Sequence, residues 1–243
     1  MLETNLRYGP TYWRNGTLPE SQSMADVQGS IRALFLEGPA GRLEGLLNQG
    51  LPGATHSGLV CHPHPLFGGT MHNKVAFHAM KALNALGLPV LRFNFRGAGL
   101  SEGEHDHGQG EVEDVIFALN WLDKEFGVPV IFAGFSFGAS VGLRACCPDA
   151  RVPALISLGT PIRAEGRSYG YGFLKQCAKP KLFVSGDGDP FGPKEDLAAL
   201  VHDLPEPKEL VLIPGAGHFF ENRLGEMRQA LDRWLREFLR RQE

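Results

Sequence analysis

Short apolar runs alternate with longer amphipathic stretches along most of this sequence. Continuous apolar runs are typical of strands buried on both faces of a parallel sheet. Apolar residues at three- and four-residue spacing are typical of amphipathic helices. The predicted strands are 58–62, 90–95, 130–135, 154–159, 181–186 and 209–214, and the predicted helices are 73–87, 111–127, 194–204 and 222–241. This order predicts an α/β fold, with a mostly parallel central sheet and helices on both faces.

Two segments near the N-terminus differ from this alternation. In residues 31–48, two apolar segments flank a Gly-Pro-Ala-Gly turn, which predicts a β-hairpin. Residues 1–23 are polar, rich in turn-forming residues and without periodicity. We therefore expect an N-terminal extension over 1–23, either disordered or a docking arm, and a single domain over 24–243.

Composition indicates which kinds of binding partner and which cellular compartment to expect. The formal net charge of −3 over 243 residues gives no basic surface for nucleic acid. No apolar run approaches the roughly 18 residues of a membrane span, and the first residues lack the apolar core of a signal peptide. The four cysteines form no C-x-x-C pair, which favours free thiols. We expect a cytoplasmic protein that binds neither nucleic acid nor membrane.

The pentapeptide Gly-Phe-Ser-Phe-Gly at 134–138 lies where the strand 130–135 meets a helical stretch. A serine on a sharp strand-to-helix turn is a nucleophile elbow, and the strained turn needs small residues two positions to either side. Gly134 and Gly138 meet that need. The turn also aims the N–H groups of the helix start at the place where an oxyanion would form. The motif therefore predicts Ser136 as a nucleophile.

A serine hydroxyl needs a base, and the base needs an acid that orients it. At such elbows the acid comes next along the chain and the histidine last. Two histidines follow Ser136, and His202 lies inside a predicted helix. His218 lies in a loop just after the last predicted strand, so we predict it as the base.

The acid is expected in the loop after the penultimate strand, which ends at Gly186. Asp187 follows one residue later, whereas Asp189 lies three residues out and can bend toward the base. We predict Asp189 as the acid and expect Asp187 to cap or brace the loop.

Histidine clustering and a Gly-rich loop raise the alternative of a metal or a dinucleotide. Five histidines lie within 23 residues, at His56, His62, His64, His72 and His78. Alternate residues of an extended chain face opposite ways, so the H-x-H pair does not favour a shared metal ion. The sequence GAGLSEG at 97–103 does not give G-x-G-x-x-G. We expect no metal and no organic cofactor.

Six motifs in the same order carry a resemblance to a known family. They are GPAGRLEG, CHPHPLFGGTMHNKV, RFNFRGAGLSEG, GFSFG, SGDGDPFG and GAGHFF. Across essentially all of 24–243 the chain resembles the α/β-hydrolase superfamily, and most of all its small lidless bacterial serine hydrolases with an H-P-H-P-L-F-G-G loop. The expected fold is therefore the α/β-hydrolase fold without a large cap domain.

The resemblance implies a function and a set of site residues. It implies a catalytic triad of Ser136, Asp189 and His218 that cleaves small ester or thioester substrates through an acyl-enzyme. It also implies an oxyanion hole made by the backbone N–H groups of Leu66 and Phe137. Pro65 replaces the glycine that usually follows the loop histidine, so either Leu66 or a neighbouring residue is the first donor. The alternative is a protein of this fold that has lost catalysis and binds a ligand or a partner.

Access to the site depends on the segment where a lid would lie. Residues 162–180 form a short, Gly-containing segment, which allows at most a small flap. We expect an uncovered site with Phe135 and Phe219 among its wall residues. Such a site favours small, soluble esters over long-chain lipids.

Overall fold

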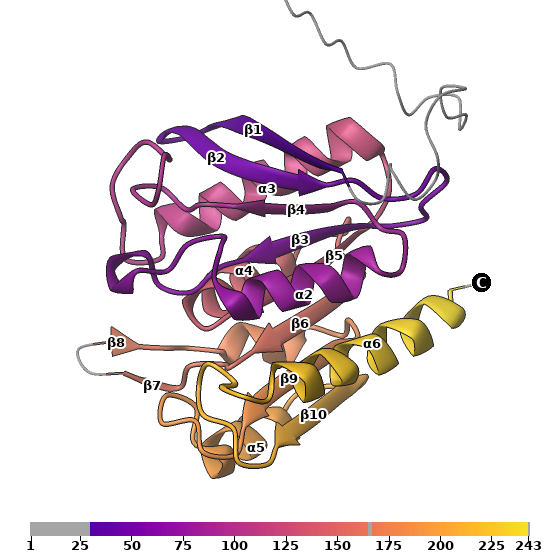
Figure 1. Ribbon diagram of the computed structural model, residues 1–243. Coiled ribbons are helices and arrows are strands. Elements are labelled where there is room, and N and C mark those ends of the chain that lie inside the picture. The colour runs from indigo at the N-terminus through magenta and orange to yellow at the C-terminus, as the bar shows by residue number, and fades with distance from the viewer. Residues whose placement is uncertain (1–29, 165–166, 243) are drawn as a thin grey trace, which may run out of the picture.

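The alternating pattern folds into one large sheet. The computed structural model describes residues 30–164 and 167–242 (Figure 1), so the predicted extension at 1–23 lies outside the described residues. The strands of the large sheet are β1 (Ile31–Gly38), β2 (Gly41–Asn48), β3 (Ser57–Cys61), β4 (Val90–Phe93), β5 (Val130–Phe135), β6 (Ala154–Leu158), β9 (Lys181–Gly186) and β10 (Lys208–Ile213).

Within this sheet the strands follow the order β1-β2-β4-β3-β5-β6-β9-β10. The predicted hairpin is present as β1 and β2, with Gly38 opposite Gly41, and β2 also runs antiparallel to β4. All other neighbours are parallel. This is the mostly parallel sheet that the alternating pattern predicted, and β5 lies near its middle.

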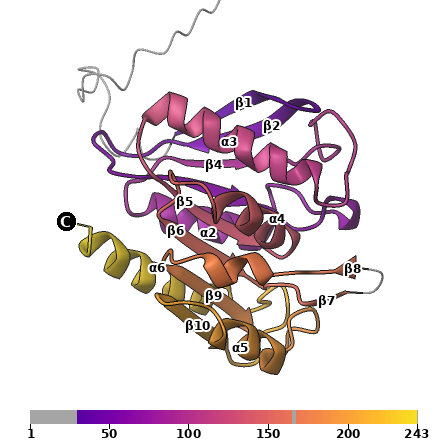
Figure 2. The same cartoon turned by 180° about the vertical axis from the view of Figure 1, so that it is seen from behind.

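Five α-helices of the described chain cover the two faces of the sheet. They are α2 (Lys74–Asn84), α3 (Gly110–Phe126), α4 (Phe137–Cys146), α5 (Lys194–His202) and α6 (Leu224–Arg240). Figure 1 shows α2 and α6 on one face, and Figure 2 shows α3, α4 and α5 on the other. Crossover helices on both faces explain why the central strands are buried throughout, with no polar side to face water.

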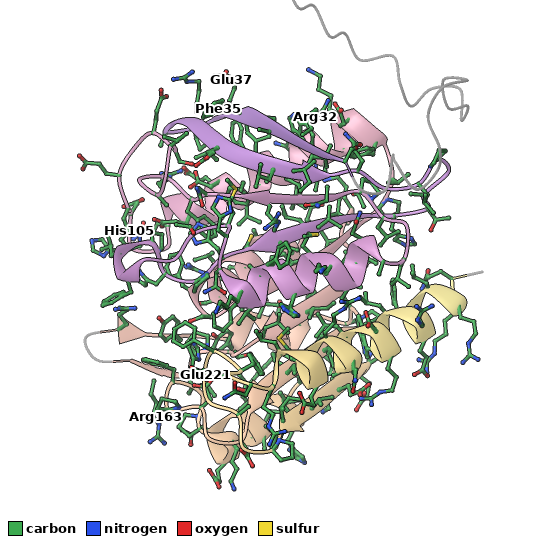
Figure 3. The ribbon with its side chains drawn as sticks, in the orientation of Figure 1. Arg32, Phe35, Glu37, His105, Arg163 and Glu221 are labelled. Carbon is green, nitrogen blue, oxygen red and sulfur yellow. The ribbon has the colours of Figure 1, made fainter. Side chains whose placement is uncertain are left out.

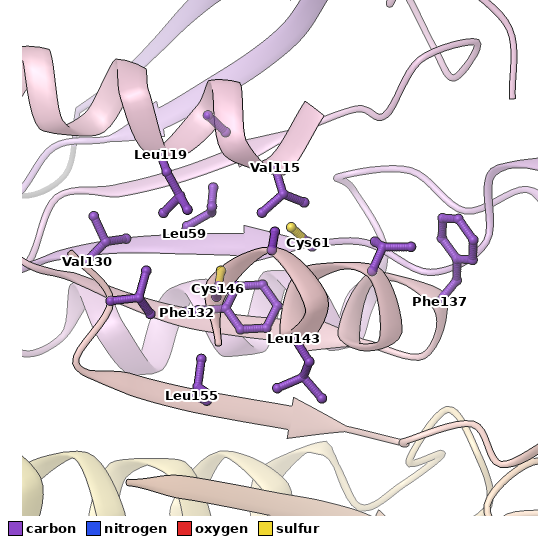
Figure 4. Close-up of a cluster of buried hydrophobic side chains, with 14 of the residues drawn as sticks. Leu59, Cys61, Val115, Leu119, Val130, Phe132, Phe137, Leu143, Cys146 and Leu155 are labelled. Carbon is purple, nitrogen blue, oxygen red and sulfur yellow. The ribbon is translucent and has the colours of Figure 1, made fainter. Parts of the chain in front are cut away.

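Two hydrophobic cores result, one on each face. Successive side chains of a strand point to opposite faces, and in β5 Phe132 packs with α3 and α4 while Ile131 and Ala133 pack with α2 and α6. Figure 4 shows the first core, where Phe132 lies among side chains of β3, α3 and α4. Packing from both sides fixes the end of β5, and with it the turn that follows.

A small flap lies between β6 and β9. It consists of two short antiparallel strands, β7 (Arg163–Ala164) and β8 (Arg167–Ser168), and the 3-10 helix η2 (Gly172–Gln176). Figure 1 shows the β7–β8 hairpin projecting beyond the edge of the sheet. The described part of this segment forms no α-helical cap.

Candidate active site

The turn after β5 holds Ser136 in a backbone conformation that few side chains adopt. Ser136 has φ of 54° and lies immediately before α4. A Cβ at Gly134 would lie 2.6 Å from the Cα of Ala139, and a Cβ at Gly138 would lie 2.3 Å from the carbonyl oxygen of His62. Both positions therefore require glycine, and the close approach lets the strand-to-helix turn present Ser136 at the carboxyl edge of the sheet.

Loops from three distant parts of the sequence bring the predicted triad together at this edge. His218, in the loop after β10, places Nε2 2.9 Å from Oγ of Ser136. Its Nδ1 lies 2.8 Å from Oδ2 of Asp189, which follows β9. A carboxylate accepts hydrogen bonds, so Nδ1 carries the proton and Nε2 is left to accept from the serine hydroxyl.

Asp189 is buried and well supplied with donors. Its Oδ1 accepts from the N–H groups of Phe191 and Gly192, and its Oδ2 accepts from the hydroxyl of Ser185. Burial by itself raises the pKa of Asp189, but the hydrogen bond and charge of His218 and the two N–H donors outweigh it and hold the pKa below its usual value. The carboxylate is therefore ionised at neutral pH.

Asp187 takes no part in this chain of hydrogen bonds. Its Oδ1 accepts from the N–H of Gly215, at 2.8 Å, and so ties the loop after β9 to the loop after β10. The loop-bracing role expected for Asp187 is confirmed by this contact.

The predicted oxyanion loop follows β3 and forms the short 3-10 helix η1 (Pro65–Phe67). The N–H of Leu66 donates to Nδ1 of His64 over 3.3 Å, so His64 braces the loop from inside. Burial, followed by the charges of Arg167, His105 and His107, lowers the pKa of His64 to about 4. Neutral His64 can therefore accept this bond. Phe137, the other predicted donor, is the first residue of α4, where backbone N–H groups have no partner within the helix.

His62 anchors the start of the same loop, a role that sequence reasoning missed. Its Nδ1 lies 2.6 Å from the carbonyl oxygen of Pro63, and its Nε2 accepts from the N–H of Phe95 at 3.0 Å. Burial lowers the pKa of His62 to about 4, against the opposing effect of the Pro63 carbonyl. The H-x-H spacing was the available signal, because alternation predicts that His62 and His64 face different neighbours.

Aromatic side chains surround the imidazole of His218. Phe135 is fully buried and lies against the ring, with ring centroids 5.0 Å apart, which suits a supporting role beneath the histidine. Phe219 is 47% exposed and Phe191 is 41% exposed, with ring centroids 5.1 and 4.7 Å from that of His218. Phe219 remains the predicted wall residue with an exposed face, and Phe191 was not anticipated.

Exposed apolar side chains continue onto the oxyanion loop. Leu66 is 65% exposed and Phe67 is 72% exposed. The rim, as we use the word below, consists of Leu66, Phe67, Phe191 and Phe219. An apolar rim beside a polar triad is typical of sites for small organic substrates.

The metal and dinucleotide alternatives concern the histidine cluster and the loop at 97–103. Over 30–164 and 167–242, no group of three or more His, Cys, Asp or Glu side chains is placed to hold a metal ion. The loop at 97–103 is instead shaped by polar contacts, because Glu44 accepts from the N–H of Leu100 and from Asn94. Within the same described ranges, no helix is long and apolar enough to cross a membrane.

Comparison with known proteins identifies the family of the chain. The family model for the alpha/beta hydrolase domain matches residues 64–239. An uncharacterized protein of Rickettsia prowazekii is 34% identical over 209 residues, which cover 83% of this chain and 87% of that protein.

Two solved structures are similar along most of their length. An alpha-beta serine hydrolase homologue from Coxiella burnetii is 42% identical, with a TM-score of 0.77 and coverage of 84% of this chain and 97% of that one. A member of the a/b serine hydrolases without a lid, from Xanthomonas campestris, is 34% identical, with a TM-score of 0.77 and coverage of 86% of this chain and 95% of that one.

Proposed function

The chain belongs to the alpha/beta hydrolase domain family, and we propose that it is a serine hydrolase that cleaves small ester or thioester substrates. One observation carries the proposal: Ser136, His218 and Asp189 form a continuous hydrogen-bonded chain at the carboxyl edge of the sheet. Acyl transfer through a covalent intermediate requires a nucleophile that contacts a base, and a base that contacts an orienting acid.

The first half of the proposed reaction forms an acyl-enzyme. The Oγ of Ser136 attacks the ester carbonyl carbon while Nε2 of His218 takes the hydroxyl proton. Asp189 keeps the proton of Nδ1 in place and stabilises the imidazolium that forms. The tetrahedral intermediate then collapses, and the leaving alcohol or thiol departs with the proton from Nε2.

The second half repeats these steps with water. His218 takes a proton from a water molecule, whose oxygen attacks the acyl carbon of the ester on Ser136. Collapse of the second tetrahedral intermediate releases the carboxylic acid and returns the proton to Oγ. No step calls for a metal or an organic cofactor, and we propose that none is used.

Two backbone N–H groups are proposed to stabilise the negative oxygen of each intermediate. The N–H of Phe137 is well placed for this, at the positive end of the α4 dipole beside Ser136. The N–H of Leu66 is the second donor, and its long bond to His64 is weak enough to be shared with an incoming oxyanion.

A covalent probe tests the proposal directly. A fluorophosphonate reacts with an activated serine, so intact-mass spectrometry should show one adduct on the wild-type protein and none on Ser136→Ala. Ser140→Ala is the matched control, because Ser140 lies in the same helix, one turn further on, and should leave labelling unchanged. An unlabelled wild-type protein, or an adduct that survives Ser136→Ala, would refute the assignment.

A further inference from the structure

The β7–β8 hairpin brings an arginine to the oxyanion loop. The guanidinium carbon of Arg167 lies 4.3 Å from the centroid of the Phe67 ring, within the range of a cation–π contact. The Phe67 ring in turn lies against His64, at a centroid distance of 5.0 Å, and His64 lies 4.6 Å from the ring of Phe137. A chain of ring contacts therefore leads from Arg167 to the residue that follows Ser136.

Arg167 differs from nearby arginines in its partners. Arg163, on the other strand of the hairpin, pairs with Asp196 of α5 at 2.5 Å. Arg144 of α4 donates to the carbonyl oxygen of Gly108 at 2.5 Å. Arg167 pairs with no acid among the residues that the structure describes, and the Phe67 ring offers it no hydrogen-bond acceptor.

Within the described ranges, the neighbours of Arg167 include no acidic side chain that pairs with it. His105 and His107 lie beside His64, with ring centroids 4.7 Å apart for His64 and His105 and 5.3 Å apart for His105 and His107. Glu111 is fully buried and already occupied, because its oxygens accept from the N–H groups of Asp106 and Gly108 and one lies 2.7 Å from Nδ1 of His105.

Figure 3 shows how the two sides of the hairpin differ. His105 lies above the hairpin in this view, and Arg163 lies below it. The positive charge of Arg163 is balanced by α5, whereas that of Arg167 lies next to the oxyanion loop. A substrate held at the triad can therefore meet, at the Phe67 end of the apolar rim, a cation that has no acid partner among the described residues.

On the basis of the proposed function, we propose that Arg167 selects ester substrates that carry a carboxylate or phosphate group. The guanidinium presents N–H donors in a fork that matches such an anion, and the ring beneath it limits its hydration and holds it in place. The apolar rim takes the hydrocarbon part of the same substrate. Half-esters of short dicarboxylic acids are the simplest compounds with this arrangement.

Matched substrates test the proposal with the full-length protein. The acyl arm compares p-nitrophenyl half-esters of succinate, glutarate and adipate with p-nitrophenyl butyrate. The alcohol arm compares 4-carboxyphenyl butyrate with its neutral methyl ester. In at least one arm, kcat/KM for the anionic substrate should fall about tenfold or more in Arg167→Gln, while kcat/KM for the neutral partner changes less than about twofold.

Two control variants separate charge recognition from a structural role. Arg163→Gln removes the same charge from the other strand and should leave the ratio of anionic to neutral kcat/KM unchanged. Arg167→Lys keeps the charge and should retain part of the selectivity. Equal losses for anionic and neutral esters in Arg167→Gln would show that Arg167 only supports the hairpin, and no loss in either arm would also overturn the proposal.

A binding measurement tests anion recognition by Arg167 separately from ester hydrolysis. If the wild-type protein hydrolyses neither member of any pair, the proposed function fails, and glutarate binding by isothermal titration calorimetry then tests the anion site alone. Glutarate should bind the wild-type protein and bind Arg167→Gln more weakly. Equal binding, or no binding to either, would overturn the anion site.

Discussion

The triad and the rim lie side by side but are held in different ways. Asp189 and His218 are 3% and 6% exposed. Ser136 and Asp189 follow the fully buried strands β5 and β9, and His218 lies in the loop after the edge strand β10. The rim side chains are 41 to 72% exposed and lie on the short 3-10 helix η1 and on loops, beside a hairpin of two-residue strands. Backbone geometry thus fixes the chemistry of the site, whereas exposed side chains on short loops are left to determine its selectivity.

The largest expected effect concerns the triad and compares Asp189, which is buried, with Asp187, which is partly exposed. Asp189→Asn should lower kcat about a thousandfold or more, because the amide cannot hold the proton on Nδ1 of His218 as the carboxylate does. Asp187→Asn should cost less than about tenfold, since its amide oxygen can still accept from Gly215. Steady-state kinetics on one neutral ester measures both variants, and circular dichroism checks that each is folded. A larger loss for Asp187→Asn would reverse the assignment.

The same contrast explains what the sequence could predict. The contacts among Ser136, Asp189 and His218 could be predicted because an elbow needs Gly134 and Gly138, and because the strand ends are visible as apolar runs that stop at polar residues. These requirements are local or follow from sheet topology. The core helices and strands were visible for the same reason.

The missed features depend on contacts between distant segments. Nothing in the local sequence shows that His62 accepts from the N–H of Phe95, or that Phe191 lies against His218. Phe135 was predicted as a wall residue, and its full burial follows from packing across the sheet that periodicity does not resolve. The contact of Arg167 with Phe67 likewise joins two segments that lie about 100 residues apart in the sequence.

An effect of intermediate size concerns His62 at the start of the oxyanion loop and is measured as the pH dependence of stability. The pKa of His62 falls from the usual 6.5 to about 4 on folding, so between these values the unfolded chain binds the additional proton. Stability should therefore decrease as the pH falls through this window, and the contribution of His62 amounts to about 2 kcal/mol between pH 7 and pH 5.

Urea unfolding of the wild-type protein and His62→Gln at pH 7 and pH 5 measures this contribution. Glutamine keeps one donor and one acceptor but does not titrate, so the variant should lose less stability than the wild type between the two pH values. His202→Gln is the control, because the His202 side chain is 87% exposed and should not alter the pH dependence. If His62→Gln lost as much unfolding free energy between pH 7 and pH 5 as the wild type, His62 would not anchor the loop in the neutral form.

The smallest expected effect concerns the rim. The rate of ester hydrolysis should not rise abruptly when the substrate passes its solubility limit. Activation at a lipid interface requires a covering element that moves away, and the described flap offers only β7, β8 and the five residues of η2. The rate of hydrolysis of tributyrin should therefore follow simple saturation through its solubility limit, with a lid-bearing lipase in the same emulsion as the positive control. Short acyl chains should also be preferred, because four exposed side chains on loops provide too little apolar surface to desolvate a long one. An abrupt rise in rate above the solubility limit, or a clear preference for p-nitrophenyl palmitate over the butyrate, would show that the rim forms a deeper lipid-binding surface than its loops indicate.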